Sequence, residues 1–187
     1  MRKLISIILL ASLWVVINPH LALAETYGSD ILTGGTESCS GTYGAPYTCD
    51  AALDNNTSTR WGTADALPQY LRYDLGAGVT AKPAKMTITS YDDVNGQGVK
   101  EWELWGSNDN FTTTSSIATG TVPDVADGTQ SSSTWAPPTT AYRYLHMNFP
   151  TNSYRGDADI TFYELELMEC TSCSAGSARK LRVFFRR

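Results

Sequence analysis

Residues 70–75 read YLRYDL, and this short stretch indicates the class of fold. Its apolar side chains Leu71, Tyr73 and Leu75 alternate with polar ones, a period of two that is typical of a strand with one face in a core. The same alternation recurs over residues 84–91, 100–106, 142–149 and 160–169. Clusters of Gly, Asn, Asp and Pro separate these segments, and no segment carries a capped helix of ten residues. The sequence therefore predicts an all-β fold, an antiparallel β-sandwich or jelly roll closed around one core.

The composition fits one packed domain. The chain has 187 residues, of which 18% are charged and 11% are aromatic, which argues against disorder. The Ser- and Thr-rich stretch over 112–134 is interpreted as a strand within loops. Formal net charge is −5, so no cationic surface for nucleic-acid phosphates is expected.

Residues 1–24 have the pattern of a secretory signal peptide. Arg2 and Lys3 precede an apolar run, and ALA at 22–24 is a typical cleavage signal before Glu25. The apolar run is too short for a bilayer span of about 20 residues, so we expect no transmembrane segment. The mature protein is expected to be secreted, either extracellular or periplasmic.

The exported part divides by charge into a body and a tail. Residues 25–174 hold all 19 acidic residues and only seven basic ones, which gives a net charge of −12. The tail, which follows residue 174, contains five basic residues interspersed with four apolar ones, Leu181, Val183, Phe184 and Phe185. We expect a folded domain over 25–173 and a disordered basic tail over 174–187, with a cationic hook for anionic surfaces as the alternative for the tail.

All four cysteines lie in the exported part, where disulfides persist. Four cysteines allow three connectivities, and we favour the local pairing of Cys39 with Cys49 and of Cys170 with Cys173. A redox motif at 170–173 is not supported, because no βαβ pattern surrounds it.

Six successive residues, 54–59, carry side-chain oxygens in the sequence DNNTST. Calcium takes six to eight oxygen ligands and tolerates irregular loops, so this stretch is a candidate cation site. An EF-hand is excluded, because Thr59 stands where that loop requires glycine. The alternative is a polar loop whose side chains bond their own backbone.

Five motifs in order resemble a known family. They are LDNNTSTRW at 53–61, PQYLRYDLG at 68–76, WGSND at 105–109, YRYLHM at 142–147 and YELEL at 163–167. Together they resemble the coagulation factor 5/8 type C, or discoidin, family of galactose-binding-like sandwiches, which includes the family 32 carbohydrate-binding modules. The resemblance runs from about residue 34 to residue 170.

The resemblance implies an eight-stranded jelly roll with a structural calcium ion beside the loop before Trp61. Carried over by position, the metal ligands would be Asp54, Asn56, Thr59 and Glu164. The ion would then connect the early loop to the last strand, and Trp61 would face the core.

Ligands in this family are bound by loops at one end of the sandwich. Sugar binding needs aromatic faces together with charged or amide groups. Three loops offer them, and the candidate ligand-binding residues are Tyr43, Tyr47, Tyr91, Asp92, Asn95, Tyr154, Arg155 and Asp157. Sugar-binding relatives commonly have a basic residue just after the strand that ends here at Tyr91, whereas this chain has Asp92 and Asp93.

The predicted function is a non-catalytic binding module for glycans. Cell-surface, phospholipid or protein adhesion without a sugar ligand is the main alternative. A glycoside hydrolase would need two carboxylates at one pocket, such as Asp92 with Asp157, and no spacing supports that pair. A Ser/His/Asp site would need His146, which lies in the middle of a predicted strand.

Overall fold

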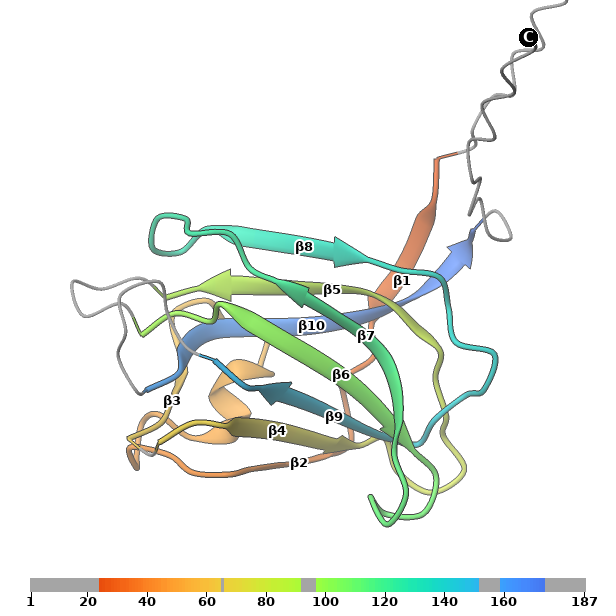
Figure 1. The fold of residues 1–187 in the computed structure, drawn as a ribbon, viewed down its shortest axis with the longest axis horizontal. Helices are drawn as coiled ribbons and strands as arrows, with labels where there is room; N and C mark the ends of the chain where they lie inside the picture. The colour runs from red at the N-terminus through yellow and green to blue at the C-terminus, as the bar shows by residue number, and fades with distance from the viewer. Residues whose placement is uncertain (1–23, 65, 92–96, 152–158, 174–187) are drawn as a thin grey trace, which may run out of the picture.

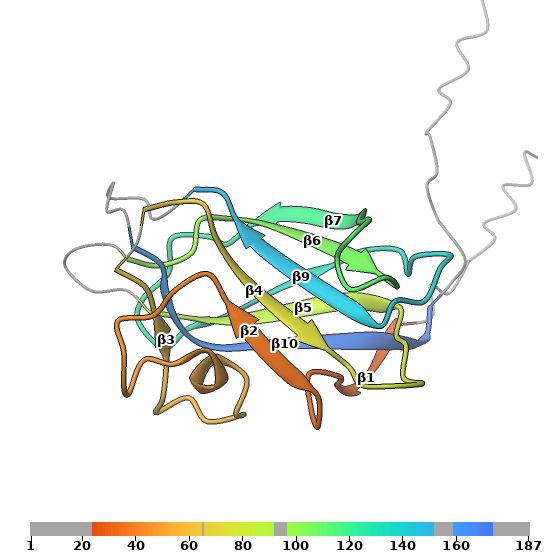
Figure 2. The ribbon, with the colours of Figure 1, turned by 90° about the horizontal axis from the view of Figure 1, so that it is seen from below.

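The structure is a computed structural model that describes residues 24–64, 66–91, 97–151 and 159–173. Over these residues it forms two antiparallel sheets packed face to face, with one short 3-10 helix, η1 (Cys49–Ala52), at their side. Figures 1 and 2 show the two layers from perpendicular directions. The predicted antiparallel β-sandwich is confirmed.

The first sheet has the strand order β1-β10-β5-β8, and β3 pairs with the start of β10. Its strands are β1 (Thr26–Asp30), β3 (Trp61–Gly62), β5 (Pro83–Ser90), β8 (Gln130–Thr134) and β10 (Thr161–Ser172). The last strand, β10, therefore lies in the middle of the sheet, where it contacts three partners.

The second sheet has the strand order β2-β4-β9-β6-β7. Its strands are β2 (Thr36–Cys39), β4 (Gln69–Asp74), β6 (Glu101–Ser107), β7 (Ser115–Thr121) and β9 (Tyr144–Phe149). Burial alternates along β4 and β9, because one face of this sheet packs on the core and the other faces solvent.

An aromatic cluster fills the core between the sheets near β3. Trp61, Phe149 and Phe162 are each fully buried, with ring centres 5.4 to 6.0 Å apart. Trp61 also donates its indole N–H to the carbonyl of Gly41 at 2.9 Å. The expected core position of Trp61 is confirmed, and its polar atom fixes the loop that follows β2.

Five of the ten described strands lie where alternation predicts them. β4, β5, β6, β9 and β10 match the five alternating segments within a few residues. The expectation of one strand within 112–134 is wrong, because β7 and β8 both form there. The described residues contain ten strands, so the eight implied by the resemblance is also an underestimate.

Both disulfides have the local pairing. Cys39 bonds to Cys49, and Cys170 bonds to Cys173, with Cα atoms 5.9 and 5.8 Å apart. No described cysteine is free.

The expected signal peptide and basic tail fall almost wholly outside the described residues, which begin at Ala24 and end at Cys173. Within the described ranges, no helix has the length and apolar character needed to cross a membrane.

Candidate functional site

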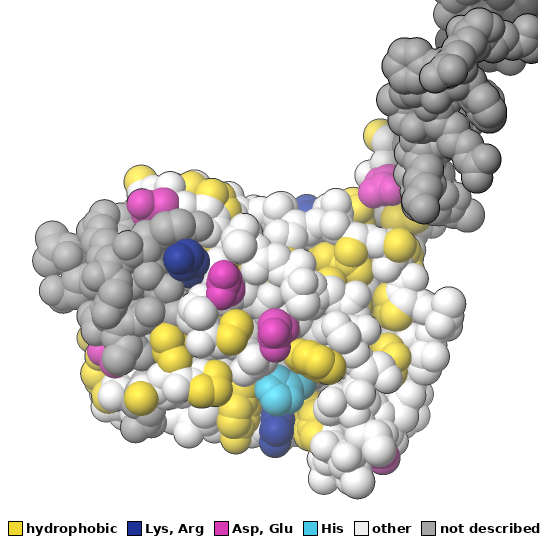
Figure 3. Space-filling model, viewed as in Figure 1, with side chains coloured by type: hydrophobic (Ala, Val, Ile, Leu, Met, Phe, Trp, Pro, Cys, Tyr) yellow, Lys and Arg dark blue, Asp and Glu magenta, His cyan; other side chains and the backbone are white. Residues whose placement is uncertain are grey.

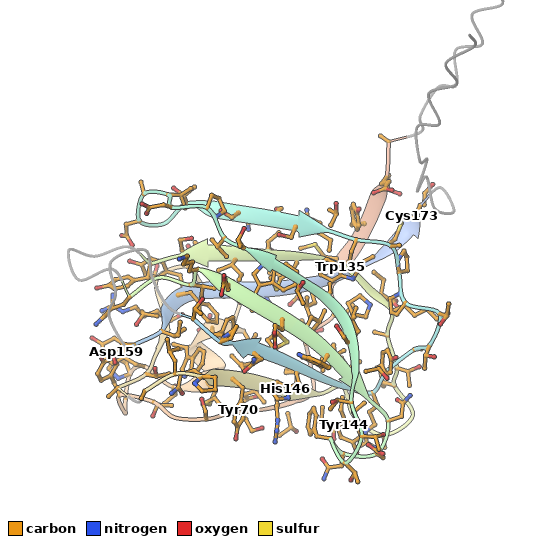
Figure 4. All side chains as sticks on the ribbon, viewed as in Figure 1. Tyr70, Trp135, Tyr144, His146, Asp159 and Cys173 are labelled. Atoms are coloured by element: carbon orange, nitrogen blue, oxygen red, sulfur yellow. A yellow bond between two sulfur atoms is a disulfide. The ribbon has the colours of Figure 1, made fainter. Side chains whose placement is uncertain are left out.

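A pocket of about 350 Å³ lies at one end of the sandwich. It is lined by Tyr43, Tyr47, Arg60, Gly62, Gln97 and Thr161, and we call it the loop-end pocket. β10 begins at this end and runs to the opposite end, where β1 starts (Figure 1). Asp159, labelled in Figure 4, marks the same end.

The loop that carries the two pocket tyrosines is fastened at several points. The disulfide between Cys39 and Cys49 closes the segment that contains both of them. The hydrogen bond from Trp61 to the carbonyl of Gly41 ties the same segment to the core. A loop fastened in this way presents its aromatic rings with little loss of conformational entropy on binding.

Tyr43 lies across β3. Its backbone N–H donates to the carbonyl of Gly62 at 2.9 Å. A Cβ atom on Gly62 would lie 3.1 Å from both the Tyr43 ring and the hydroxyl of Thr161, so glycine lets the ring approach the strand. The Tyr43 side chain remains 45% exposed, and its ring meets that of Tyr47 edge to face at 6.1 Å. The pocket thus offers an accessible aromatic surface.

Arg60 is the basic residue among the described residues that line the loop-end pocket. Its guanidinium carbon lies 4.2 Å from the ring centre of Tyr91 and 4.9 Å from that of Tyr47, both within the range of cation–π contacts. It also donates to the Tyr47 hydroxyl at 3.4 Å. A basic group therefore does lie beside Tyr91, although it comes from the segment before β3 and not from the residues after β5.

The carboxylate of Asp159 and the side-chain amide of Gln97 are further polar groups at the loop-end pocket. The Tyr43 hydroxyl donates to the carboxylate of Asp159, and the Gln97 side-chain N–H donates to that carboxylate at 3.4 Å. The backbone carbonyl of Gln97 accepts the backbone N–H of Thr161 at 2.8 Å, which fixes Gln97 to β10. Sequence reasoning named none of Arg60, Gln97 and Asp159 as ligand residues. Arg60 stood in the motif at 53–61 without an assigned ligand role, and Gln97 and Asp159 were marked only by their position in or beside predicted loops.

The predicted ligand residues divide into two groups. Tyr43, Tyr47 and Tyr91 converge around Arg60 at the loop end. The remaining five lie outside the described residues: Asp92, Asn95, Tyr154, Arg155 and Asp157.

The predicted metal ligands are joined by hydrogen bonds. Asp54 accepts the backbone N–H of Asn56 at 2.9 Å and the hydroxyl of Thr59 at 2.7 Å. The same Asn56 N–H is shared with the Glu164 carboxylate at 3.1 Å. Segments more than 100 residues apart in the sequence thus meet at the early loop and β10.

Glu164 has the character of an anion that needs a partner. It is only 4% exposed, and its Oε1 atom is buried with no hydrogen-bond partner among the described residues. The pKa of Glu164 is raised to about 7, chiefly by burial and further by the negative charges of Asp54 and Asp30, against the lowering effect of the Asn56 N–H. A divalent cation would satisfy this oxygen, so the residues present fit a calcium ion.

The candidate cation site contains two carboxylates. No cluster of three or more His, Cys, Asp or Glu side chains suited to a metal occurs among the described residues. Any ion held by Asp54 and Glu164 would therefore take its other ligands from neutral oxygens, such as those of Asn56 and Thr59, or from water.

His146 does not have the surroundings of a catalytic base. Its Nδ1 atom accepts the Nε–H of Arg72 at 3.4 Å, whereas a triad histidine donates from Nδ1 to a carboxylate. Burial, together with the charge of Arg72, lowers the pKa of His146 to about 4. The ring is therefore neutral and weakly basic near pH 7.

The two packed antiparallel sheets make this molecule a β-sandwich domain. The comparison of its sequence with family models then shows its family. The sequence model of the F5/8 type C domain matches residues 35–163. The chain therefore belongs to the F5/8 type C, or discoidin, family. The comparison with curated proteins finds no match.

Several solved structures share the fold. A family 32 carbohydrate-binding module from Clostridium perfringens NanJ, in complex with galactose, has a TM-score of 0.61 and 21% identity; the match covers 78% of this chain and all (100%) of the module. Another family 32 module from C. perfringens, in complex with GalNAc-β-1,3-galactose, has a TM-score of 0.61 and 16% identity. This match covers 75% of our chain and 99% of the module.

A third similar structure is an F5/8 type C domain from Bacteroides fragilis. Its TM-score is 0.63 at 17% identity, and the match covers 77% of this chain and 97% of that domain. At these identities the structures establish the shared fold.

Proposed function

We propose that this protein is a secreted, non-catalytic module that binds glycans at the loop-end pocket and is stabilised by calcium. The observation that carries the proposal is the grouping of the exposed Tyr43 and the half-buried Tyr47 and Tyr91 with polar groups at one end of the sandwich. The polar groups are Arg60, Gln97 and Asp159. The complexes of two similar family 32 modules with galactose-containing sugars support it.

The chemistry of the pocket suits a sugar ring. The Tyr43 ring offers an apolar surface for the C–H face of a pyranose. Arg60 provides donors, Asp159 provides acceptors, and Gln97 provides both, which matches hydroxyl groups that donate and accept. An open pocket of this kind buries little area, so one site should bind with a dissociation constant of about 0.1 to 1 mM. Several copies or partners would then be needed for tight binding.

The proposed role of calcium is structural. A bound calcium ion would neutralise the carboxylates of Asp54 and Glu164 and connect the early loop to β10. The same loop continues through Arg60 into β3, so its position also determines where the pocket cation lies.

A glycan array tests ligand class and calcium dependence together. We expect the protein to bind a limited set of glycans in calcium, and less of each in the presence of a chelator. Arg60→Ala should reduce every signal roughly tenfold, because the substitution removes the donors and the cation beside two tyrosines.

The matched control is Val79→Ala. Val79 is 50% exposed, close to the exposure of Tyr43, and it lies in the turn between β4 and β5 outside the pocket. Tyr43→Ala should weaken binding while Val79→Ala leaves it unchanged. Binding only to phosphatidylserine liposomes, with no glycan signal, would instead establish the adhesion alternative.

A further inference from the structure

The solvent-facing side of the second sheet carries two rows of chemically distinctive residues. Strand register places Arg72 of β4, His146 of β9 and Trp105 of β6 opposite one another. The neighbouring row contains Tyr70, Asn148 and Glu103 on the same three strands. Since side chains two residues apart share a face, all six project from one side of the sheet.

A tight turn adds a further aromatic ring to this face. Phe111 lies in the connection from β6 to β7 with a φ of 63°, and Asn110 before it has a φ of 54°. Asp109 fastens this turn, since it accepts the Ser107 hydroxyl at 2.7 Å and the Thr113 hydroxyl at 2.6 Å. Positive φ at two successive non-glycine residues is costly, and the turn holds Phe111 in that conformation.

These elements enclose a depression of about 400 Å³, within the size range of small-ligand sites. It is lined by Arg72, Glu103, Trp105, Phe111, Thr114, His146 and Asn148, and we call it the sheet-face depression. Figure 3 shows the histidine of this face in cyan, between a basic side chain and acidic ones. Figure 4 shows Tyr70 and His146 on adjacent strands. The sheet-face depression and the loop-end pocket share no lining residue.

Arg72 is positioned by aromatic rings. Its guanidinium carbon lies 4.4 Å from the ring centre of Tyr70 and 4.7 Å from that of Phe111. Its Nε–H donates to His146, and it forms no ion pair with any carboxylate that the structure describes. The other guanidinium N–H groups are thus held in place beside the depression as donors.

Glu103 is the complementary acceptor. Its Oε2 atom accepts the side-chain N–H of Asn148 at 2.9 Å and the indole N–H of Trp105 at 3.3 Å. These two bonds orient the carboxylate and the Trp105 ring relative to each other. Oriented acceptors next to an aromatic ring are the arrangement that recognises a sugar, since one ring face is apolar and the hydroxyls are polar.

We propose that the sheet-face depression is a second glycan site, separate from the loop-end pocket, that binds a neutral pyranose residue. A hydroxyl both donates and accepts, so it matches a guanidinium and a carboxylate that are not paired with each other. An acidic sugar would meet Glu103 on a body of net charge −12, and a purely apolar ligand would leave both charges desolvated. The proposal stands on the lining of this depression and does not require the loop-end pocket to bind.

Affinity electrophoresis in gels containing galactomannan, xyloglucan, mixed-linkage glucan or xylan tests the proposal. The starting protein is Arg60→Ala, so that the loop-end pocket is weakened. We expect at least one neutral polysaccharide to retard this protein, and Trp105→Ala in the same background to weaken that retardation roughly tenfold. A gel containing polygalacturonate should give no retardation.

Arg72→Gln is the second variant, because truncation of Trp105 can lower stability. It should also weaken binding, whereas Tyr27→Ala on β1 should not; circular dichroism checks that each variant is folded. The proposal is overturned if no neutral polysaccharide retards Arg60→Ala, if both face variants bind like their parent, or if only polygalacturonate retards the protein. Failure of the loop-end pocket would be seen separately, as equal binding by the wild type and Arg60→Ala.

Discussion

The histidine on β9 shows how one residue makes stability depend on pH. His146 is partly buried, and burial with the nearby charge of Arg72 lowers its pKa to about 4, against a smaller opposite effect of Glu103. The unfolded chain has a histidine pKa near 6.5. Between these two values the unfolded state therefore binds more protons, so stability falls as pH decreases from about 6.5 to about 4.

His146→Gln removes this contribution. We expect the loss of unfolding free energy between pH 7 and pH 4 to be about 1 to 3 kcal/mol smaller in the variant than in the wild type. Urea denaturation at a series of pH values measures the difference. Parallel pH profiles for the two proteins would contradict the assigned surroundings of His146.

Single residues of the candidate site were predictable where residue type and position agreed. Tyr43 and Tyr47 stood out as aromatic residues in a predicted loop, and both line the pocket. Arg60 was harder to find, because its place in the pocket depends on the packing of Tyr91, which directly follows β5, against a segment about 30 residues earlier. The sequence pattern alone does not show that Arg60 and Tyr91 are in contact.

Among the elements, the loop from β2 to η1 connects stability to the proposed site. Its disulfide, Cys39–Cys49, closes a loop of sequence separation 10. Chain-entropy arguments give such a crosslink about 2 to 3 kcal/mol. The loop also positions Tyr43 and Tyr47, so its freedom should affect binding.

We therefore expect the double variant Cys39→Ser/Cys49→Ser to lose about 2 to 3 kcal/mol of unfolding free energy and to bind its glycan more weakly. Chemical denaturation and the glycan array measure the two effects. The matched control is Cys170→Ser/Cys173→Ser, whose disulfide has a sequence separation of 3 and lies at the far end of β10. Equal effects of the two double variants on binding would be evidence against this role.

A strand was easier to predict when one of its faces is buried in the core and the other faces solvent. β4 and β9 alternate between buried and half-buried residues, and the sequence shows the same alternation. β1 and β2 are missing from the prediction because they lie at sheet edges with no fully buried residue. β8 has the sequence QSSST and forms through its register with β5, which local composition does not encode.

At the scale of the whole molecule, calcium is expected to join two distant parts of the chain. An ion that binds only the folded state at a hundredfold excess over its dissociation constant adds about 2.7 kcal/mol. For a domain of this size that corresponds to a rise in Tm of about 5 to 10 °C. Differential scanning calorimetry with calcium and with a chelator measures it.

Glu164→Gln should abolish the calcium-induced rise in Tm, because it removes one of the two carboxylates. Glu169→Gln, on the same strand, should keep the rise, since Glu169 accepts the N–H of Lys82 outside the oxygen-rich loop. A rise of equal size in Glu164→Gln would place any bound ion elsewhere.

The fold itself was the most predictable property, because a period of two specifies strands and five ordered motifs specify their family. The proposed ligand site was less predictable, since it is assembled from residues before β3, after β5 and before β10 that meet only in three dimensions. The sheet-face depression left no motif at all, because register across β4, β9 and β6 creates it.

The most direct test of glycan binding at the loop end is NMR of the ¹⁵N-labelled protein, titrated with the strongest-binding glycan from the array. Binding there predicts progressive shifts in the backbone amide signals of Gly62 and Gln97, which lie beside the Tyr43 ring and the Asp159 carboxylate. Saturation of binding with both signals unmoved, and shifts confined to other parts of the molecule, would contradict the account.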